Sequence, residues 1–227
     1  MGQQGKVTYF TKFSFGLPLT TETYLWFDTE KSLCIQKHFV KNEVDLYDSN
    51  TPVIVVPENS EGFVYYKSYN SQEMTLKTAF MKDEFIVTDS LPKIKWKIFN
   101  DTKKIGQLNC QKAVGEFRGR MYTVWFTNRF PISSGPWKLH GLPGLILEAQ
   151  DEKGEVQFLF KSIEYPLKEK IEVKPPTGVP DMSFELYRKY SEDIEEYIMK
   201  KIMTKMPRGI TAKFNGPKKK QNLLEKF

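Results

Sequence analysis

The sequence predicts a mainly β protein: a meandering antiparallel sheet, curved into a half-barrel or barrel-like form, with a C-terminal amphipathic helix. Apolar and polar residues alternate in many short segments up to about residue 165, which is the period of a half-buried strand. The chain contains 17 Phe, 11 Tyr and 4 Trp, and aromatic side chains fit a pleated surface. Tight polar connections separate the segments, and a sheet of so many strands is expected to curl.

The expected strands follow one another along most of the chain. They cover residues 7–13, 23–27, 33–40, 62–67, 74–80, 84–87, 95–99, 110–117, 120–127, 145–149 and 155–163. Polar residues between them are expected to form turns, among them 28–31 and 100–103, and residues 151–154 are a strong hairpin signal. Short connections of this kind favour an antiparallel meander.

Three shorter regions follow a β domain expected at residues 1–174. Residues 175–180 are rich in Pro and Gly and are expected to be a linker. A helix over 181–206 is expected to begin at an N-cap, either Asp181 or Ser183, and 207–227 to be a basic tail. The helix has one apolar stripe, expected to pack on the sheet, with a partner-binding face as the alternative. The stripe consists of Leu186, Tyr190, Ile194, Tyr197, Ile198 and Ile202.

Composition and charge limit the classes of function. The chain has 227 residues and a net charge of +6, part of which comes from the tail. A basic patch can bind nucleic acid, but no nucleic-acid-binding motif accompanies this one, so we expect a solvated tail and no nucleic-acid partner. No apolar run of about 18 residues occurs, so no transmembrane segment is expected. The first residues do not form a signal peptide, so the protein is either cytosolic or exported with its signal peptide removed.

The run Gly135–Leu147 combines two Pro and three Gly with several large apolar residues. It cannot be a helix interior, because Pro lacks a backbone donor and Gly permits positive φ. It is too apolar for a solvated loop, so we expect a turn packed into the protein. Within it, Gly141 or Gly144 is expected to have positive φ, and Leu142–Pro143 to pack against the sheet.

Two pairs of side chains could bind a ligand. Arg118 and Arg120 flank Gly119, and a guanidinium can bind a carboxylate or phosphate through two hydrogen bonds. The alternative for Arg120 is a salt bridge with a strand carboxylate such as Glu116 or Glu148. Trp125 and Trp137 could line an apolar cavity or belong to the core.

Nothing in the sequence indicates catalysis, a cofactor or a metal site. The only histidines are His38, expected on a strand surface, and His140, and no metal-ligand spacing occurs. Cys110 precedes His140 without a motif that would indicate a nucleophilic pair. Cys34 and Cys110 could form a disulfide in an exported protein, whereas Cys34 also fits a buried free thiol.

Several segments at fixed spacing resemble the signature of the GLPGLI family. They are Cys110–Ala113, Phe117–Arg120, Tyr122–Thr127, Pro131–Ile132, Gly135–Lys138 and the hexapeptide Gly141, Leu142, Pro143, Gly144, Leu145 and Ile146, which is followed by Leu147. The resemblance implies an exported protein of Bacteroidetes, located in the periplasm or at the outer membrane, of unknown specific function. Residues 122–165 also resemble, more weakly, LolA-type half-barrels, in which a curved sheet surrounds an apolar cavity.

Three functions remain as hypotheses. The first is non-enzymatic binding of an apolar ligand or peptide, such as a lipid, in the cell envelope. The second is a structural or accessory role through contacts with an envelope protein partner. The third is a hydrolase that uses a pair of carboxylates. An apolar cavity would favour the first, a filled core with an exposed apolar patch the second, and a cleft with paired carboxylates the third.

Overall fold

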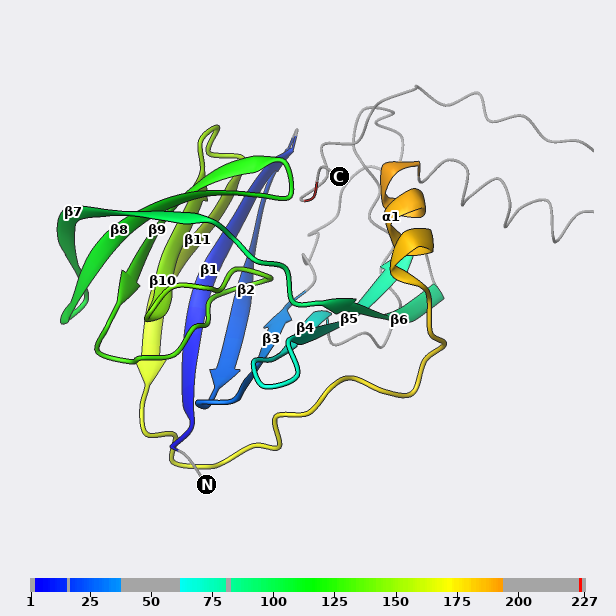
Figure 1. The fold of residues 1–227 in the computed structure, drawn as a ribbon, viewed down its shortest axis with the longest axis horizontal. Coiled ribbons are helices and arrows are strands. Elements are labelled where there is room, and N and C mark those ends of the chain that lie inside the picture. Colours follow the sequence, from blue (N-terminus) through cyan, green and yellow to red (C-terminus); the bar gives the residue numbers. More distant parts are fainter. Residues whose placement is uncertain (1–2, 16, 38–61, 81–82, 194–224, 226–227) are drawn as a thin grey trace, which may run out of the picture.

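A computed structural model describes residues 3–15, 17–37, 62–80, 83–193 and 225 of this chain. In this part of the protein, eleven strands form one curved sheet, and a single helix follows them (Figure 1). The strands are β1 (Gly5–Phe15), β2 (Leu17–Phe27), β3 (Lys31–Gln36), β4 (Phe63–Ser68), β5 (Glu73–Phe80), β6 (Asp83–Ser90), β7 (Trp96–Ile105), β8 (Leu108–Phe117), β9 (Arg120–Thr127), β10 (Leu145–Asp151) and β11 (Val156–Glu164). The helix is α1 (Phe184–Glu192). The predicted mainly β, antiparallel, curved fold is confirmed.

The order of the strands explains the curvature. The sheet runs β6-β5-β4-β3-β2-β1-β11-β10-β9-β8-β7 with every pair antiparallel, so the two edge strands follow each other in the sequence. A flat sheet of eleven strands would measure about 48 Å between its edges. The connection from Ser90 to Trp96 spans at most about 21 Å. The sheet must therefore curl until its two edges approach each other where this connection joins them.

One expected turn lies inside a strand. The polar residues 100–103 belong to β7, where we expected a turn after residue 99. Ile98 pairs with Ala113 and Thr102 with Gln111, so four steps along β7 match two steps along β8. A β-bulge takes up the extra residues, which lets a polar stretch continue the strand. Residues 38–40 of another expected strand, including His38, lie outside the described residues.

The helix begins where one of the two proposed caps stands. The Ser183 hydroxyl accepts a hydrogen bond from the Leu186 amide at 3.2 Å, whereas Asp181 forms a bridge with Ile86 of β6. The predicted position of Leu186 on the buried stripe is wrong, because its side chain is exposed. Tyr190 of the expected stripe is buried, and Tyr187, three residues before it, is buried in the place of Leu186; both belong to the core. Residues 194–206 of the expected helix, and the tail apart from Glu225, lie outside the described part.

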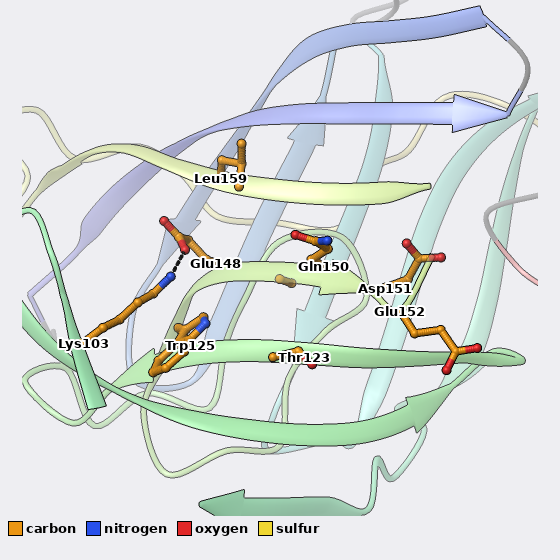
Figure 2. Close-up of a pocket in the computed structure, with 9 residues that line it drawn as sticks. Lys103, Thr123, Trp125, Glu148, Gln150, Asp151, Glu152 and Leu159 are labelled. Carbon is orange, nitrogen blue, oxygen red and sulfur yellow. Dashed lines mark hydrogen bonds and ion pairs between the residues drawn. The ribbon is translucent and has the colours of Figure 1, made fainter. Parts of the chain in front are cut away.

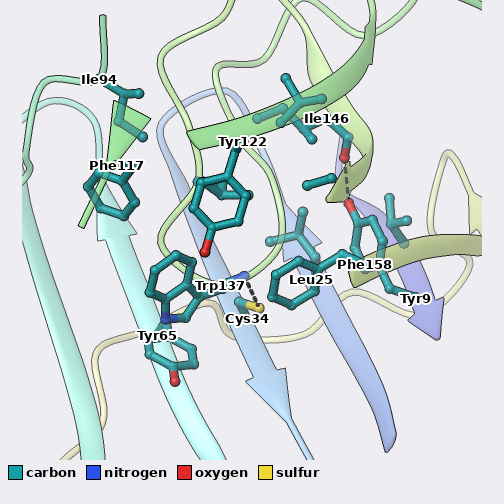
Figure 3. Packing of buried hydrophobic residues seen from close by; sticks show 14 of the residues in the cluster. Tyr9, Leu25, Cys34, Tyr65, Ile94, Phe117, Tyr122, Trp137, Ile146 and Phe158 are labelled. Atoms are coloured by element: carbon teal, nitrogen blue, oxygen red, sulfur yellow. Dashed lines mark hydrogen bonds between the residues drawn. The ribbon is translucent and has the colours of Figure 1, made fainter. Parts of the chain in front are cut away.

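The core lies on the inner side of the curved sheet, and residues 128–144 fill it (Figures 1 and 3). This segment joins β9 to β10 and contributes Trp137, Leu139 and Leu142, all almost completely buried. They pack with inward-facing side chains from both halves of the sheet, such as Leu25 and Phe158. We call residues 128–144 the inner loop. The inner side is therefore a packed core.

Candidate functional site

Two buried side chains of the sheet hold the inner loop in place. The Lys67 ammonium donates hydrogen bonds to the carbonyls of Gly135, Trp137 and Leu139 at 2.8, 3.1 and 3.1 Å. The Trp137 amide donates to Cys34 Sγ at 3.1 Å (Figure 3). A buried loop cannot satisfy its own carbonyls with a strand ladder, so it needs such donors. Burial lowers the pKa of Lys67 to about 8.

The hexapeptide packs closely against the protein at Leu142 and Gly144. Gly141 has a φ of +93°, as predicted, and Leu142 is buried. A Cβ on Gly144 would lie 2.4 Å from the Thr127 carbonyl oxygen, so no side chain fits there without a shift of the backbone. Pro143 is exposed, so the expected packing of Leu142–Pro143 holds for Leu142 alone. The hexapeptide therefore brings its own backbone, at Gly144, into close contact with the backbone of β9 at Thr127.

The cysteines are both free and buried, on β3 and β8. Burial raises the pKa of each thiol, Cys34 and Cys110, to about 11. A neutral thiol in an apolar surrounding acts as a small hydrophobic side chain. Of the two alternatives for Cys34, the structure has the buried free thiol and not the disulfide.

Arg120 forms a buried salt bridge with partners other than the ones we expected. Its guanidinium lies 2.6 Å from carboxylate oxygens of both Asp151 and Glu155, not of Glu116 or Glu148. Asp151 also accepts a hydrogen bond from the Val156 amide at 2.9 Å. These contacts tie β9 to the β10–β11 hairpin, so Arg120 has a structural role.

The two candidate tryptophans occupy different places, and neither lines an apolar cavity. Trp137 is completely buried in the core. Trp125 lines a mixed polar groove of about 320 Å³ on the other face of the sheet (Figure 2). The Lys103 ammonium lies 4.6 Å from the centre of the Trp125 ring and 2.5 Å from Glu148. The groove is therefore lined by the ion pair of Lys103 with Glu148 beside one aromatic ring, and by two further acids, Asp151 and Glu152.

Arg118 lies at the rim of the curved sheet, in the tight turn between β8 and β9. Arg118 and Gly119 have φ of 49° and 69°, the signature of a type I′ hairpin turn. The turn brings the guanidinium to Asp89 of β6, with Nη2 3.1 Å from the carboxylate. Its Nε also lies 3.7 Å from Glu225. Arg118 thus contacts both Asp89, on the edge strand β6, and Glu225.

Glu225 connects Arg118 to a second cation, Lys138 of the inner loop. Lys138 is completely buried and forms an ion pair with Glu225. Its ammonium lies 5.3 Å from the centre of the Tyr187 ring, and the Tyr187 hydroxyl is 3.5 Å from Glu225. We call these five residues, Asp89, Arg118, Lys138, Tyr187 and Glu225, the rim cluster.

Burial and charge act against each other in the rim cluster. Burial lowers the pKa of Lys138, and the negative charge of Glu225 opposes that shift. Burial raises the pKa of Tyr187 well above its ordinary value, so this hydroxyl stays neutral and can donate. The cluster therefore matches two cations with two carboxylates in a site that water barely reaches.

A shallow groove of about 410 Å³ opens beside the rim cluster. It lies where the β6–β7 connection passes the end of β8, and Arg118 belongs to both the groove and the cluster. We call it the rim groove. It is lined by Pro92, Lys93, Lys95, Glu116, Phe117 and Arg118. Because Arg118 is paired with Asp89 and Glu225, the two lysines against Glu116 give the groove its positive balance.

Of the site residues predicted from the sequence, only Arg118 lies in the rim cluster. Sequence reasoning missed the other four members: Asp89, Lys138, Tyr187 and Glu225. Lys138 carried a usable signal, because it stands between Trp137 and Leu139 in a run expected to be buried, and a buried lysine needs a partner. The partner could not be found, because Glu225 is remote in sequence.

The described residues offer neither a metal site nor a membrane-crossing helix. No group of three or more His, Cys, Asp or Glu side chains lies close enough to hold an ion in this part of the chain. His140 is buried, with Nδ1 2.9 Å from the Lys138 carbonyl, and burial lowers its pKa to about 4. Among the helical residues described, none forms a helix long and apolar enough to cross a bilayer.

Comparison with known proteins supports the fold and names no activity. Residues 116–148 match the model of a family described as "Protein of unknown function (Porph_ging)". This stretch contains the β8–β9 turn, the inner loop and the hexapeptide. No curated protein matches the chain.

Solved structures with a similar fold include two crystal forms of PNGF-II, in space groups C2 and P21. Each has a TM-score of 0.58 and 18% identity and covers 82% of this chain and 32% of that chain. The chain thus spans about a third of the length of PNGF-II. An uncharacterized conserved protein from Thermus thermophilus has a TM-score of 0.43 and 9% identity, covering 81% of this chain and 91% of that chain. The PNGF-II likeness supports the curved β fold alone.

Proposed function

We propose that this protein is a non-enzymatic binding protein that recognises an acidic segment of another polypeptide in the rim groove. The carrying observation is the charge of that groove: the exposed Lys93 and Lys95 line it beside a single exposed acid, Glu116. Arg118 also lines it, but its charge is already paired with Asp89 and Glu225. Phe117 also lines the groove, so it offers one apolar contact beside the charged ones. Such complementarity guides association and selects the partner.

The filled inner side supports a peptide rather than an apolar ligand enclosed by the sheet. In a carrier, the concave face would leave space for a lipid, but here Trp137, Leu139 and Leu142 occupy it. The polar groups that remain accessible lie at the rim and on the other face. A polypeptide segment bound at the surface fits this distribution.

A binding role also fits the electrostatics of the rim cluster. Each charged group there faces an opposite charge, so the four charges form a structural network of ion pairs. A general acid–base pair instead needs two groups whose environments move their pKa values apart. We therefore propose binding without catalysis.

We also propose that this protein is exported and acts in the cell envelope. The support is the resemblance to exported proteins of Bacteroidetes described above and the match of residues 116–148 to a family of unknown function. Fractionation of cells that make the natural protein, followed by immunodetection in the envelope and cytoplasmic fractions, tests this part.

A second candidate is an accessory role through direct contact with a partner protein at the free edge strand β7. Ile98 on this strand has 44% of its surface exposed, although it is a large apolar residue. In the described part, β7 ends the sheet and has a neighbour on one side only. Substitution Ile98→Lys would weaken such a contact and leave binding in the rim groove unchanged.

Calorimetry with acidic and basic hexapeptides tests the main proposal. Hexaglutamate is expected to bind and hexalysine is not, with an affinity that falls as salt rises. The double variant Lys93→Gln/Lys95→Gln should lose about five- to thirtyfold in affinity, from about 0.5–1 kcal/mol for each exposed charge. The matched control, Lys97→Gln/Lys104→Gln, removes the same charge from β7 outside the groove.

Two results would overturn the proposal. One is no binding of hexaglutamate at low salt. The other is an equal loss of affinity in both double variants, because binding would then follow net charge and not the groove.

A further inference from the structure

We infer that the rim cluster is a receptor for one glutamate or aspartate side chain at the end of the rim groove, and that Glu225 of the chain itself occupies it in this structure. The inference rests on the proposed function and names the anchoring residue of the bound segment. The receptor groups are Lys138, Arg118 and Tyr187.

Lys138 makes the receptor selective for an acid. Its side chain has no exposed surface, and its ammonium is paired with Glu225. A buried ammonium without a counter-charge is strongly unfavourable, so a carboxylate has to fill this position. A neutral amide of the same shape could accept a hydrogen bond but would not neutralise the charge.

Arg118 joins the receptor to the rim groove. Its guanidinium lies against Glu225 in the cluster, and the same residue lines the groove with Lys93 and Lys95. Arg118 is also paired with Asp89 at 3.1 Å, so the arginine would keep a counter-charge if Glu225 left. Lys138 would lose the carboxylate of Glu225, so an incoming carboxylate would take that position beside the ammonium.

Glu225 itself shows which side chain fits. In the sequence it stands in the run NLLEKF, residues 222–227, so a peptide with this run supplies the same glutamate from outside. The expected ligand is therefore a segment that carries a glutamate or aspartate, which must displace Glu225 to bind.

The test removes the charge of the resident glutamate and supplies the segment from outside. The probe is the labelled peptide NLLEKF with both ends blocked, so that the glutamate is its only carboxylate, and its affinity is measured by fluorescence anisotropy. The full-length variant Glu225→Gln should bind the probe at least tenfold more tightly than the wild type, because no internal carboxylate competes. The control peptide NLLQKF should bind at least tenfold more weakly to this variant.

Two further variants control for charge and for folding. Glu172→Gln removes an exposed acid away from the cluster and should bind the probe as the wild type does. Lys138→Met/Glu225→Gln replaces the ion pair by two neutral side chains and should fold but not bind. If Glu225→Gln is unfolded at the working temperature, refolding on addition of NLLEKF, but not of NLLQKF, is the supporting result.

The outcomes separate this inference from the proposed function. Equal affinity of the two peptides for Glu225→Gln, or equal affinity of the wild type and Glu225→Gln for NLLEKF, overturns the inference. If hexaglutamate still binds in a way that needs Lys93 and Lys95, the proposed function stands without this anchor. If neither peptide binds any form of the protein, both are wrong.

Discussion

Substitution Gly144→Ala tests most directly whether the hexapeptide is structural. Gly144 immediately precedes β10, where this strand begins to pair with β9. An added Cβ would lie 2.4 Å from the Thr127 carbonyl oxygen and 2.8 Å from its carbon. Close carbon–oxygen contacts in proteins are about 3.3 Å or longer, so the two backbones must separate by about 0.9 Å.

The expected cost follows from that separation. The two nearest of the three atoms met by the new methyl group belong to the backbone, which cannot rotate away as a side chain would. Insertion of one methyl group into such a tight contact costs about 1–3 kcal/mol. For a chain of this size, each kcal/mol lowers Tm by about 2–4 °C, so the expected fall is about 2–12 °C.

Thermal and urea unfolding of the variant, followed by circular dichroism, measure this cost. Gln150→Ala is the matched control, because it changes an exposed residue of the same strand and should alter stability by less than about 0.5 kcal/mol. An unchanged melting curve for Gly144→Ala would refute the reasoning. The hexapeptide would then need a functional explanation.

Two other predictions concern buried ionisable groups. Lys67→Met should lower the free energy of unfolding by about 3 kcal/mol in urea titrations, because three carbonyls of the inner loop lose their donor. His140 has a folded pKa of about 4, below its unfolded value of about 6.5, so its contribution is complete above pH 6.5 and falls as the pH drops towards 4. The loss amounts to about 3 kcal/mol in the free energy of unfolding from urea titrations between pH 7 and pH 4, and it should disappear in His140→Asn; the same loss in both proteins would contradict the assignment.

The strands could be predicted because their signal is local. Alternation identifies the buried side of a strand from its own residues, as in β9, where Tyr122 and Val124 face the core and Thr123 faces away from it. The cap at Ser183 and the positive φ at Gly141 were also local, since each depends on one residue and its neighbours.

The candidate site could not be predicted in the same way, because its partners are set by the order of the strands. Arg118 meets Asp89 only because the sheet curls and brings the β8–β9 turn to β6. Lys138 meets Glu225 only because the inner loop lies on the inner side of the sheet and Glu225 comes to it there. The turn predicted at residues 100–103 is wrong for a related reason. These turn-like residues lie at a bulge within β7, and the position of this bulge depends on the pairing with β8.

The inner loop also explains why a curved sheet of this kind need not be a carrier, and Trp137 allows a test. The side chain is completely buried and packs against Phe117 and Tyr122, with ring centres 5.4 and 6.2 Å away. Trp137→Ala should cost about 3–5 kcal/mol and leave an apolar cavity where the indole was.

If the inner loop is a plug that fills an otherwise empty half-barrel, added indole should bind in that cavity. At ten times its dissociation constant, indole would restore about 1.4 kcal/mol, or about 3–6 °C in Tm, to Trp137→Ala and nothing to the wild type. An equal shift in both proteins would place indole elsewhere, and no shift in the variant would mean that the surrounding core closes over the gap. In either case, the inner loop would not be the feature that distinguishes this fold from a half-barrel that carries a ligand.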